Sequence, residues 1–158
     1  MSNEGHRLGD HIKLLMPLFG FIAAVWLLRI MLGAAGVSHW LLGAVSVTVA
    51  ASLSVLLAVL MIHVRRFGSY SSVVMSALLL VAWGHLLIVL AIVFSVATGL
   101  DNIFVAPEFS VPGEDRFHMR HILGHLTLGI GAGTLFGAAT GCLLLWLLRR
   151  LVPVEARE

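Results

Sequence analysis

Residues 73–98 read VVMSALLLVAWGHLLIVLAIVFSVAT and contain no Asp, Glu, Lys or Arg. An α-helix of about 20 apolar residues crosses the roughly 30 Å hydrocarbon core of a bilayer. Three more apolar runs in the chain are long enough for the same crossing. We therefore predict an all-α membrane protein, a four-transmembrane-helix bundle, with helices at approximately 14–36, 39–64, 73–98 and 116–149 and an outer loop at 99–115.

The composition agrees with this fold class and argues against others. Hydrophobic residues make up 59% of the 158 residues and charged residues only 11%, which is typical of an integral membrane protein. The sequence lacks the segments of alternating polarity that mark a membrane β-barrel. It also has no basic tract suited to nucleic acid. We expect one integral membrane domain over residues 1–158.

The distribution of Lys and Arg predicts the orientation. If the helices alternate in direction, seven of these side chains fall on one side: Arg7, Lys13, Arg65, Arg66, Arg149, Arg150 and Arg157. The opposite side has only Arg116 and Arg120, while Arg29 lies within the first apolar run, where snorkelling to the surface explains it. The positive-inside rule then predicts that both termini are cytoplasmic.

A series of small residues at intervals of four predicts close helix packing. The segment 116–149 contains a glycine zipper, formed by Gly129, Gly133, Gly137 and Gly141. The segment 39–64 has a second series of small residues at the same interval, formed by Ser46, Ala50, Ser54 and Ala58. Small residues let helix backbones approach closely in lipid. We expect these two faces to pack together. The glycines either serve packing alone or leave a groove for a flat or long ligand, such as a porphyrin edge, quinone, carotenoid or lipid chain.

A histidine cluster marks the outer end of the fourth helix. His118, His121 and His125 fall within a 60° arc of a helical wheel, and His39 begins the second helix on the same side. Such residues can hold a divalent metal, with His118, His121 and His125 as ligands. His39 and His125 can instead hold haem b between facing helices. Two further alternatives stay open, namely hydrogen bonds to headgroups and loop acids, and a quinone or proton-relay site.

His85 is a separate candidate because it lies near the centre of the third helix, where an ionisable group must face the bundle interior or a bound molecule. Its imidazole either hydrogen-bonds a neighbouring helix, at Ser54 or Thr48, or binds haem iron or a chlorophyll magnesium. The sequence offers no second histidine at the same predicted depth. We therefore expect His85 to have no histidine partner within one chain.

The long outer loop carries Phe104, Phe109 and Phe117 among several acidic residues. Aromatic side chains are enriched at membrane interfaces. We expect this loop to lie along the outer interface with its aromatic rings among the headgroups.

The sequence lacks the motifs of several catalytic classes. It contains no HExxH zinc site, no phosphate-binding GxxxxGK[ST] loop and no GxSxG nucleophile motif. The near-absence of charge within the last three apolar runs argues against an ion-coupled transporter. We expect no independent catalytic activity.

The arrangement is similar in architecture to membrane anchors and assembly factors of respiratory chains, including small b-type cytochromes. The resemblance implies a small integral subunit or accessory factor of a larger, redox-linked complex in a bacterial cytoplasmic membrane. Its histidines would bind haem, metal or quinone on the outer side, and its partners would be the bilayer and other membrane subunits or further copies of the chain. The alternatives are a purely structural or lipid-interacting protein without a cofactor, and a small oligomeric transporter or channel.

Overall fold

The computed structural model describes residues 7–106 and 117–151, and all regular secondary structure in those ranges is helical. Four helical stretches are long and apolar enough to cross a membrane, as the sequence predicted. The elements in chain order are α1 (Leu8–Ala34), α2 (His39–Ala44), α3 (Val47–Val64), α4 (Tyr70–Thr98), α5 (Met119–Gly124), the π-helical turn η1 (His125–Gly129) and α6 (Ile130–Leu151).

The first helix is longer than predicted. It begins at Leu8 and continues through Pro17, whereas the sequence pattern placed its start near residue 14. The backbone N–H of Arg7 donates to the Asp10 carboxylate at 3.1 Å, which supports the helix start in this polar segment. A proline is tolerated within a membrane helix because neighbouring groups can satisfy the freed carbonyl.

The predicted helix 39–64 is divided into α2 and α3 at Val45 and Ser46. Ser46 is the N-cap of α3, and its hydroxyl accepts from the Val49 N–H at 3.5 Å. The guanidinium of Arg29 donates from Nη1 to the Val45 carbonyl oxygen at 2.9 Å. A side chain from α1 thus satisfies a backbone group at the break, which is what an interruption of a helix inside an apolar environment requires.

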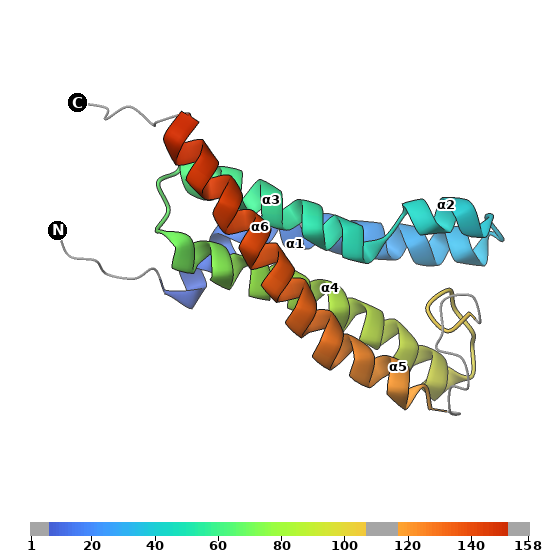
Figure 1. The fold of residues 1–158 in the computed structure, drawn as a ribbon. Helices are drawn as coiled ribbons and strands as arrows, with labels where there is room; N and C mark the ends of the chain where they lie inside the picture. The colour runs from blue at the N-terminus through green and yellow to red at the C-terminus, as the bar shows by residue number, and fades with distance from the viewer. Residues whose placement is uncertain (1–6, 107–116, 152–158) are drawn as a thin grey trace.

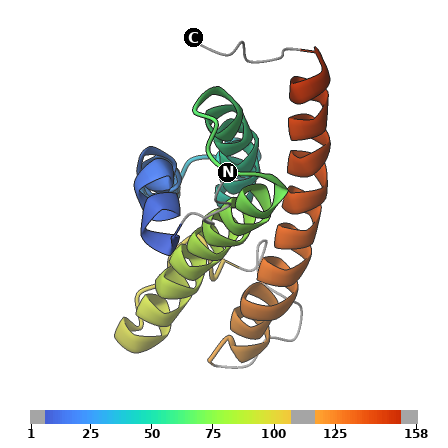
Figure 2. The same ribbon diagram turned by 90° about the vertical axis from the view of Figure 1, so that its left-hand side faces the viewer.

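The four spanning stretches run up and down, and α4 lies between α1 and α6 (Figures 1 and 2). α4 contacts α1, α3 and α6, and α3 contacts the same two outer helices. The turn between α3 and α4 lies at the same end as the start of α1 and the end of α6 (Figure 1). At this end Arg149 donates to the Gly68 carbonyl oxygen at 3.2 Å, so the last turn of α6 is tied to that turn.

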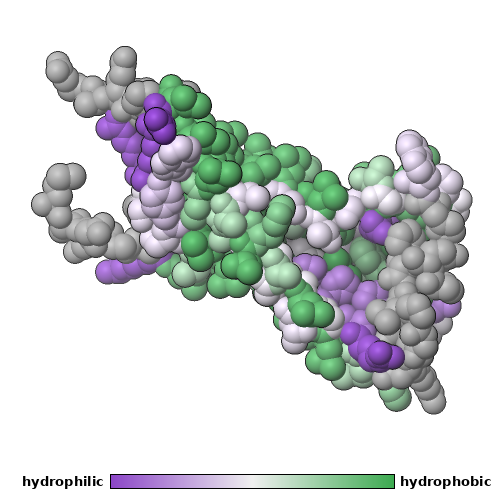
Figure 3. Space-filling view, viewed as in Figure 1, coloured by the Kyte–Doolittle hydropathy of each residue, from purple (hydrophilic) through white to green (hydrophobic). Residues whose placement is uncertain are grey.

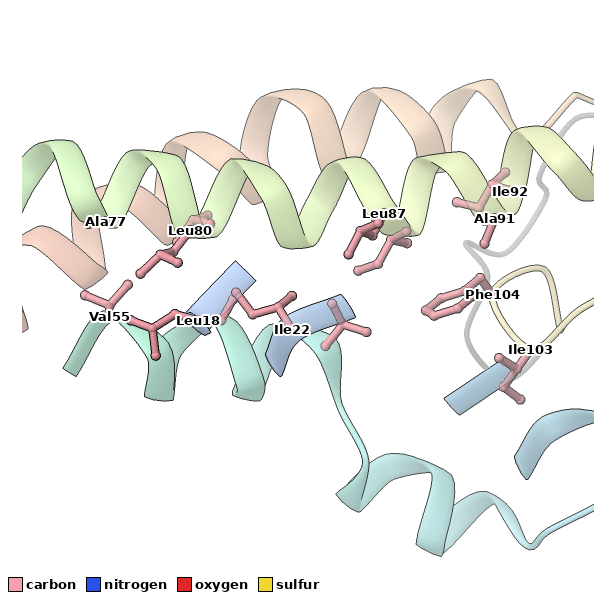
Figure 4. Close-up of a cluster of buried hydrophobic side chains, with 14 of the residues drawn as sticks. Leu18, Ile22, Val55, Ala77, Leu80, Leu87, Ala91, Ile92, Ile103 and Phe104 are labelled. Atoms are coloured by element: carbon pink, nitrogen blue, oxygen red, sulfur yellow. The ribbon is translucent and has the colours of Figure 1, made fainter. Parts of the chain in front are cut away.

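At the opposite end the bundle opens into two arms, α1 with α2 and α4 with α5 (Figure 1). The core between the helices is formed by buried aliphatic side chains from α1, α3 and α4, such as Ile22, Val55 and Leu80 (Figure 4). Trp83 joins α4 to α1, because its indole N–H donates to the Phe19 carbonyl oxygen at 3.1 Å. The separation of the two arms leaves room for polar side chains between them.

The chain after α4 folds back into this opening. α4 ends at Thr98 and is capped by Gly99, whose backbone is left-handed (φ 71°) and whose N–H donates to the Ser95 carbonyl oxygen at 2.8 Å. Asn102 then donates to the Ala91 carbonyl oxygen at 2.7 Å and accepts from the Phe104 N–H at 2.9 Å. These bonds hold the next residues against α4, inside the bundle.

The prediction for the first aromatic ring of this loop is therefore wrong. Phe104 is only 6% exposed and packs within the core cluster beside Leu87 and Ala91 (Figure 4), because Asn102 turns the chain inward. Phe117 is exposed, and Phe109 lies outside the described residues.

Candidate functional site

Three histidines, His85 of α4 and the pair His121 and His125 of α5 and η1, form a continuous hydrogen-bonded chain in the half of the bundle where the two arms separate. His85 Nδ1 and His125 Nδ1 are 2.8 Å apart, and His125 Nε2 and His121 Nε2 are 3.1 Å apart. The neighbouring rings are tilted, with centroid separations of 5.0 and 4.8 Å. His125 is the central member and uses both of its ring nitrogens within the chain.

The partner of His85 differs from the predicted one. We expected Ser54 or Thr48, and no other histidine at that depth, but the structure places His125 there. Ser54 instead donates to the carbonyl oxygen of Ala50 in its own helix, at 2.8 Å. The prediction from depth failed because the position of a residue along its helix does not give the direction of its side chain, and here the His85 ring lies against the backbone at Gly129, within 2.8 Å of His125 Nδ1.

Gly129 makes this contact between the histidines feasible. A Cβ atom added at Gly129 would lie 2.6 Å from His85 Cε1 and 2.8 Å from His85 Nδ1, which is closer than atoms can approach. The imidazole therefore lies directly on the η1 backbone at Gly129, and from there it reaches His125 one turn earlier. The glycine is required by the histidine chain as well as by helix packing.

The rest of the glycine series packs against α4 at the same interval of four. A Cβ at Gly133 would meet Val81 at 2.8 Å, and one at Gly141 would meet Val73 at 2.8 Å. Gly137 lies in ordinary contact distance of Ala77. The glycine face is therefore filled by α4 side chains, and the described structure leaves no groove along it for a flat ligand.

The predicted pairing of this face with the series in 39–64 is only partly present. α3 does contact α6, but Gly137 and Gly141 meet its valines Val55 and Val59 rather than the small residues. Of the small series, Ala50, Ser54 and Ala58 are buried within the bundle, and Ser46 caps α3. The difference arises because a helical wheel identifies the small face of a helix without identifying which neighbour it contacts.

A π-helical turn lies where the histidines give way to the glycines. Residues 125–129 form η1, between α5 and α6. A π-turn contains an extra residue relative to an α-helical turn and often occurs at functional sites. His125 is the first residue of this turn and Gly129 is the last, so η1 joins the histidines to the glycine face that packs on α4 and α3.

A small polar cavity lies beside the histidine chain. Its volume is about 170 Å³, and we call it the polar cavity; its lining residues are Arg29, Ser46, Val47, Thr48, Ile88, Phe104, His121 and His125. Hydrophilic residues are visible in the hollow between the two arms of the bundle (Figure 3). The cavity therefore combines a guanidinium, two hydroxyls and two imidazoles with an aromatic ring and two aliphatic walls.

Arg29 is a component of the site because its side chain lines the polar cavity. Snorkelling was expected, but the side chain is 7% exposed and is directed inward, because it donates to Val45 at the helix break. Its guanidinium carbon lies 5.5 Å from the centroid of Phe104, a cation–π distance. Phe104 was not predicted from the sequence to be part of the site. The one feature of the sequence that could have indicated its inward position is Asn102, which turns the chain inward.

The other predicted ligands are not joined to this chain. His118 is the N-cap of α5, with a left-handed backbone (φ 51°), and no hydrogen bond in the described part links it to His121 or His125. His39 is the first residue of α2, which packs on α1, and its side chain lies outside the described portion. Among the described residues, no three His, Cys, Asp or Glu side chains are arranged to hold a metal ion.

The hydrogen-bond chain has two consistent proton arrangements. In one, His121 donates to His125 and His125 donates to His85; in the other, every donor and acceptor is reversed. In either case the bond to His85 determines which nitrogen of His125 carries the proton. His85 is thus a positioning residue for His125, while His121 and His125 face the polar cavity.

The half of the bundle nearer the turn between α3 and α4 is tightly packed between α4 and α6. Below His85, the next contacts between α4 and α6 are Val81 with Gly133, Ala77 with Gly137 and Val73 with Gly141. Val73 has no exposed surface and Val81 is 5% exposed. Among the described residues, the histidine chain therefore leads to the polar cavity and not toward the turn between α3 and α4.

Comparison with known proteins assigns no relative, because no family model, no curated protein and no solved structure matches this chain.

Proposed function

We propose that this protein is a small integral subunit or accessory factor of a larger, redox-linked complex in a bacterial cytoplasmic membrane, and that its polar cavity binds the headgroup of a quinone. The observation that carries the proposal is the chain from His85 through His125 to His121, which ends on that cavity. We expect the subunit to supply binding and protons, while a redox centre of a partner subunit supplies electrons.

The cavity lining supports a quinone headgroup because a quinone is a flat ring with two carbonyl acceptors. Arg29, Ser46 and Thr48 are donors, and Phe104 and Ile88 supply flat or apolar contacts. Ligand pockets for drug-sized molecules have volumes of about 300–1,000 Å³. At about 170 Å³ the polar cavity is suited to a single ring rather than to a larger cofactor.

The geometry supports a hydrogen-bonded site better than a haem site. A metal ion lies about 2.0–2.1 Å from an imidazole nitrogen, so two nitrogens on opposite sides of it are roughly 4 Å apart. The Nδ1 atoms of His85 and His125 are 2.8 Å apart, which is a hydrogen-bond distance. The filled glycine face likewise leaves no space for a porphyrin edge.

Reduction of a bound quinone in the polar cavity requires protons, and a path for them from one side of the membrane is sufficient. Reduction of a quinone to a quinol consumes two electrons and two protons. We propose that His121 and His125 transfer the protons from the outer side, with His85 holding His125 in the correct tautomer. The tight packing of Val81 and Val73 on α6 disfavours a channel through the bundle, which was the competing transporter interpretation.

The proposed orientation places both termini in the cytoplasm. The turn at Arg65 and Arg66 lies at the same end of the bundle as Arg149 and Arg150 (Figure 1). This clustering supports a cytoplasmic location for that end. The polar cavity then lies in the outer half of the membrane.

Binding can be tested with a quinone analogue that lacks a hydrocarbon tail. At a hundredfold excess over its Kd, a ligand that binds only the folded state stabilises the protein by about 2.7 kcal/mol. We expect this stabilisation in the native protein and its loss in His121→Ala and Arg29→Met. His63→Ala, at the inner end of α3, serves as the matched control and should keep it.

The absence of stabilisation in the native protein would refute the quinone proposal. A visible haem spectrum that disappears in His125→Ala would replace it with the haem interpretation. Proton uptake provides a second test in liposomes, where chemical reduction of the bound quinone should consume protons from the outer compartment, and uptake from the inner compartment would contradict the one-sided path.

A further inference from the structure

A second cavity, larger and mainly apolar, lies beside the polar cavity at the outer end of the bundle. Its volume is about 550 Å³, and we call it the apolar cavity. Apolar side chains from α1, α2, α4 and the segment after α4 line it, including Ile30, Leu42, Phe94, Ile103 and Val105. This volume falls within the range of sites that bind small molecules.

One three-residue segment separates the two cavities. Ile103 and Val105 line the apolar cavity, and Phe104 between them lines the polar cavity. The three residues form a turn, in which the Val105 N–H donates to the Asn102 carbonyl oxygen at 3.1 Å, and this turn directs Phe104 to one cavity and its two neighbours to the other. All three side chains are at most 8% exposed, so the segment is a buried partition and not a surface loop.

The partition is held in place by specific contacts. Asn102 anchors it through hydrogen bonds to α4 and to the Phe104 N–H. On the other side Ile103 lies against Gly33 of α1, where an added Cβ would be only 2.8 Å from the Ile103 Cβ (Figure 4). α1 contributes to both cavities through consecutive residues, Arg29 to the polar one and Ile30 to the apolar one.

We propose that the apolar cavity holds the hydrocarbon tail of the ligand whose headgroup occupies the polar cavity; this inference rests on the proposed function. The ligand class is thus a ring with one long isoprenoid or alkyl chain, which passes the Phe104 partition. Water is a poor alternative occupant, because an ordered buried water needs two to four polar partners. Among the described residues, the polar side chains that line it are those of Asp101 and Asn102, and the Asn102 amide is already bonded to α4.

The location of the tail can be tested by photolabelling. A quinone analogue with a diazirine at the end of its alkyl tail is added to the protein in liposomes, and the labelled residues are identified by mass spectrometry. We expect labelling at Phe94 and Val105. Ala34→Phe, which fills the apolar cavity, should reduce this labelling by about tenfold, equivalent to about 1.4 kcal/mol. Ala35→Phe, at the adjacent position outside the lining, is the matched control and should not reduce it.

The outcomes separate this inference from the proposed function. The analogue without a tail should stabilise Ala34→Phe as much as the native protein, because the polar cavity is unchanged. Labelling that is equal in Ala34→Phe and Ala35→Phe, or that occurs only on the lipid-facing surface, would overturn the tail site. If the analogue without a tail fails to bind, a diazirine-bearing alkyl alcohol still tests the apolar cavity. Labelling at Phe94 that is abolished in Ala34→Phe would support a hydrocarbon site there. The absence of labelling at Phe94 would refute it.

Discussion

Replacing Gly129 with alanine should separate His85 from His125 and destabilise the protein. The new methyl carbon would lie 2.6 Å from His85 Cε1, so the ring must move by roughly 0.8 Å to reach an ordinary contact distance. If the ring moves directly away from His125, the 2.8 Å separation of the two Nδ1 atoms becomes about 3.6 Å, beyond hydrogen-bond reach. The variant therefore tests the role of Gly129 in the histidine chain.

The expected energy follows from three effects. Overpacking a buried contact costs about 1–3 kcal/mol, and the lost hydrogen bond costs about 0.5–1.5 kcal/mol. Alanine recovers about 0.8–1.0 kcal/mol through its higher helix propensity. We expect a net decrease of roughly 0.5–3.5 kcal/mol in the free energy of unfolding.

Gly131 provides the matched control in the same helix. A Cβ at Gly131 meets nothing within 4 Å, so Gly131→Ala should gain up to about 1 kcal/mol from helix propensity alone. Unfolding of the variants in mild detergent, followed by circular dichroism, measures the difference. A Gly129→Ala protein as stable as Gly131→Ala would refute the contact.

A double variant distinguishes the His85 contact from a general effect on the helix. Removing the ring in His85→Ala creates the space that the new methyl group needs. In that background Gly129→Ala should no longer destabilise the protein, which appears as a favourable coupling energy in a double-mutant cycle. Additive effects of the two substitutions would contradict the proposed arrangement.

Three further outcomes are expected from the fold. Gly133→Ile should lower the melting temperature in detergent, because any Cβ there lies 2.8 Å from Val81 and overpacking costs about 1–3 kcal/mol. An unchanged melting temperature would argue against close contact between α6 and α4 at this position. Arg29→Met should lower the free energy of unfolding by about 1.5–3 kcal/mol, because the charged hydrogen bond to the Val45 carbonyl oxygen is lost. Arg29→Lys should lower it by an intermediate amount. Denaturant midpoints that do not follow this order would contradict the inward position of the arginine. Reporter fusions at Glu158 should be active only as cytoplasmic reporters, and periplasmic activity would reverse the proposed orientation.

Much of the fold follows from local sequence properties. The run 73–98 predicted a membrane-spanning helix because hydrophobicity and length belong to the segment itself, and α4 covers Tyr70–Thr98. The interval of four between glycines predicted a close helix contact for the same reason. The breaks were not predictable in this way: Val45 and Ser46 lie within a run of uniform hydropathy, and only the hydrogen bond from Arg29 reveals why the helix can end there.

The sequence by itself determined which segments are helical and apolar enough to span a membrane, and that one helix has a small-residue face, since these depend on the order of residues along one helix. The tertiary structure decided that this face contacts α4, that His85 reaches His125, and that Arg29 and Phe104 enclose the same cavity. Those contacts join residues far apart in the chain. They depend on the register and lateral order of the helices, which side-chain shape determines and hydropathy does not.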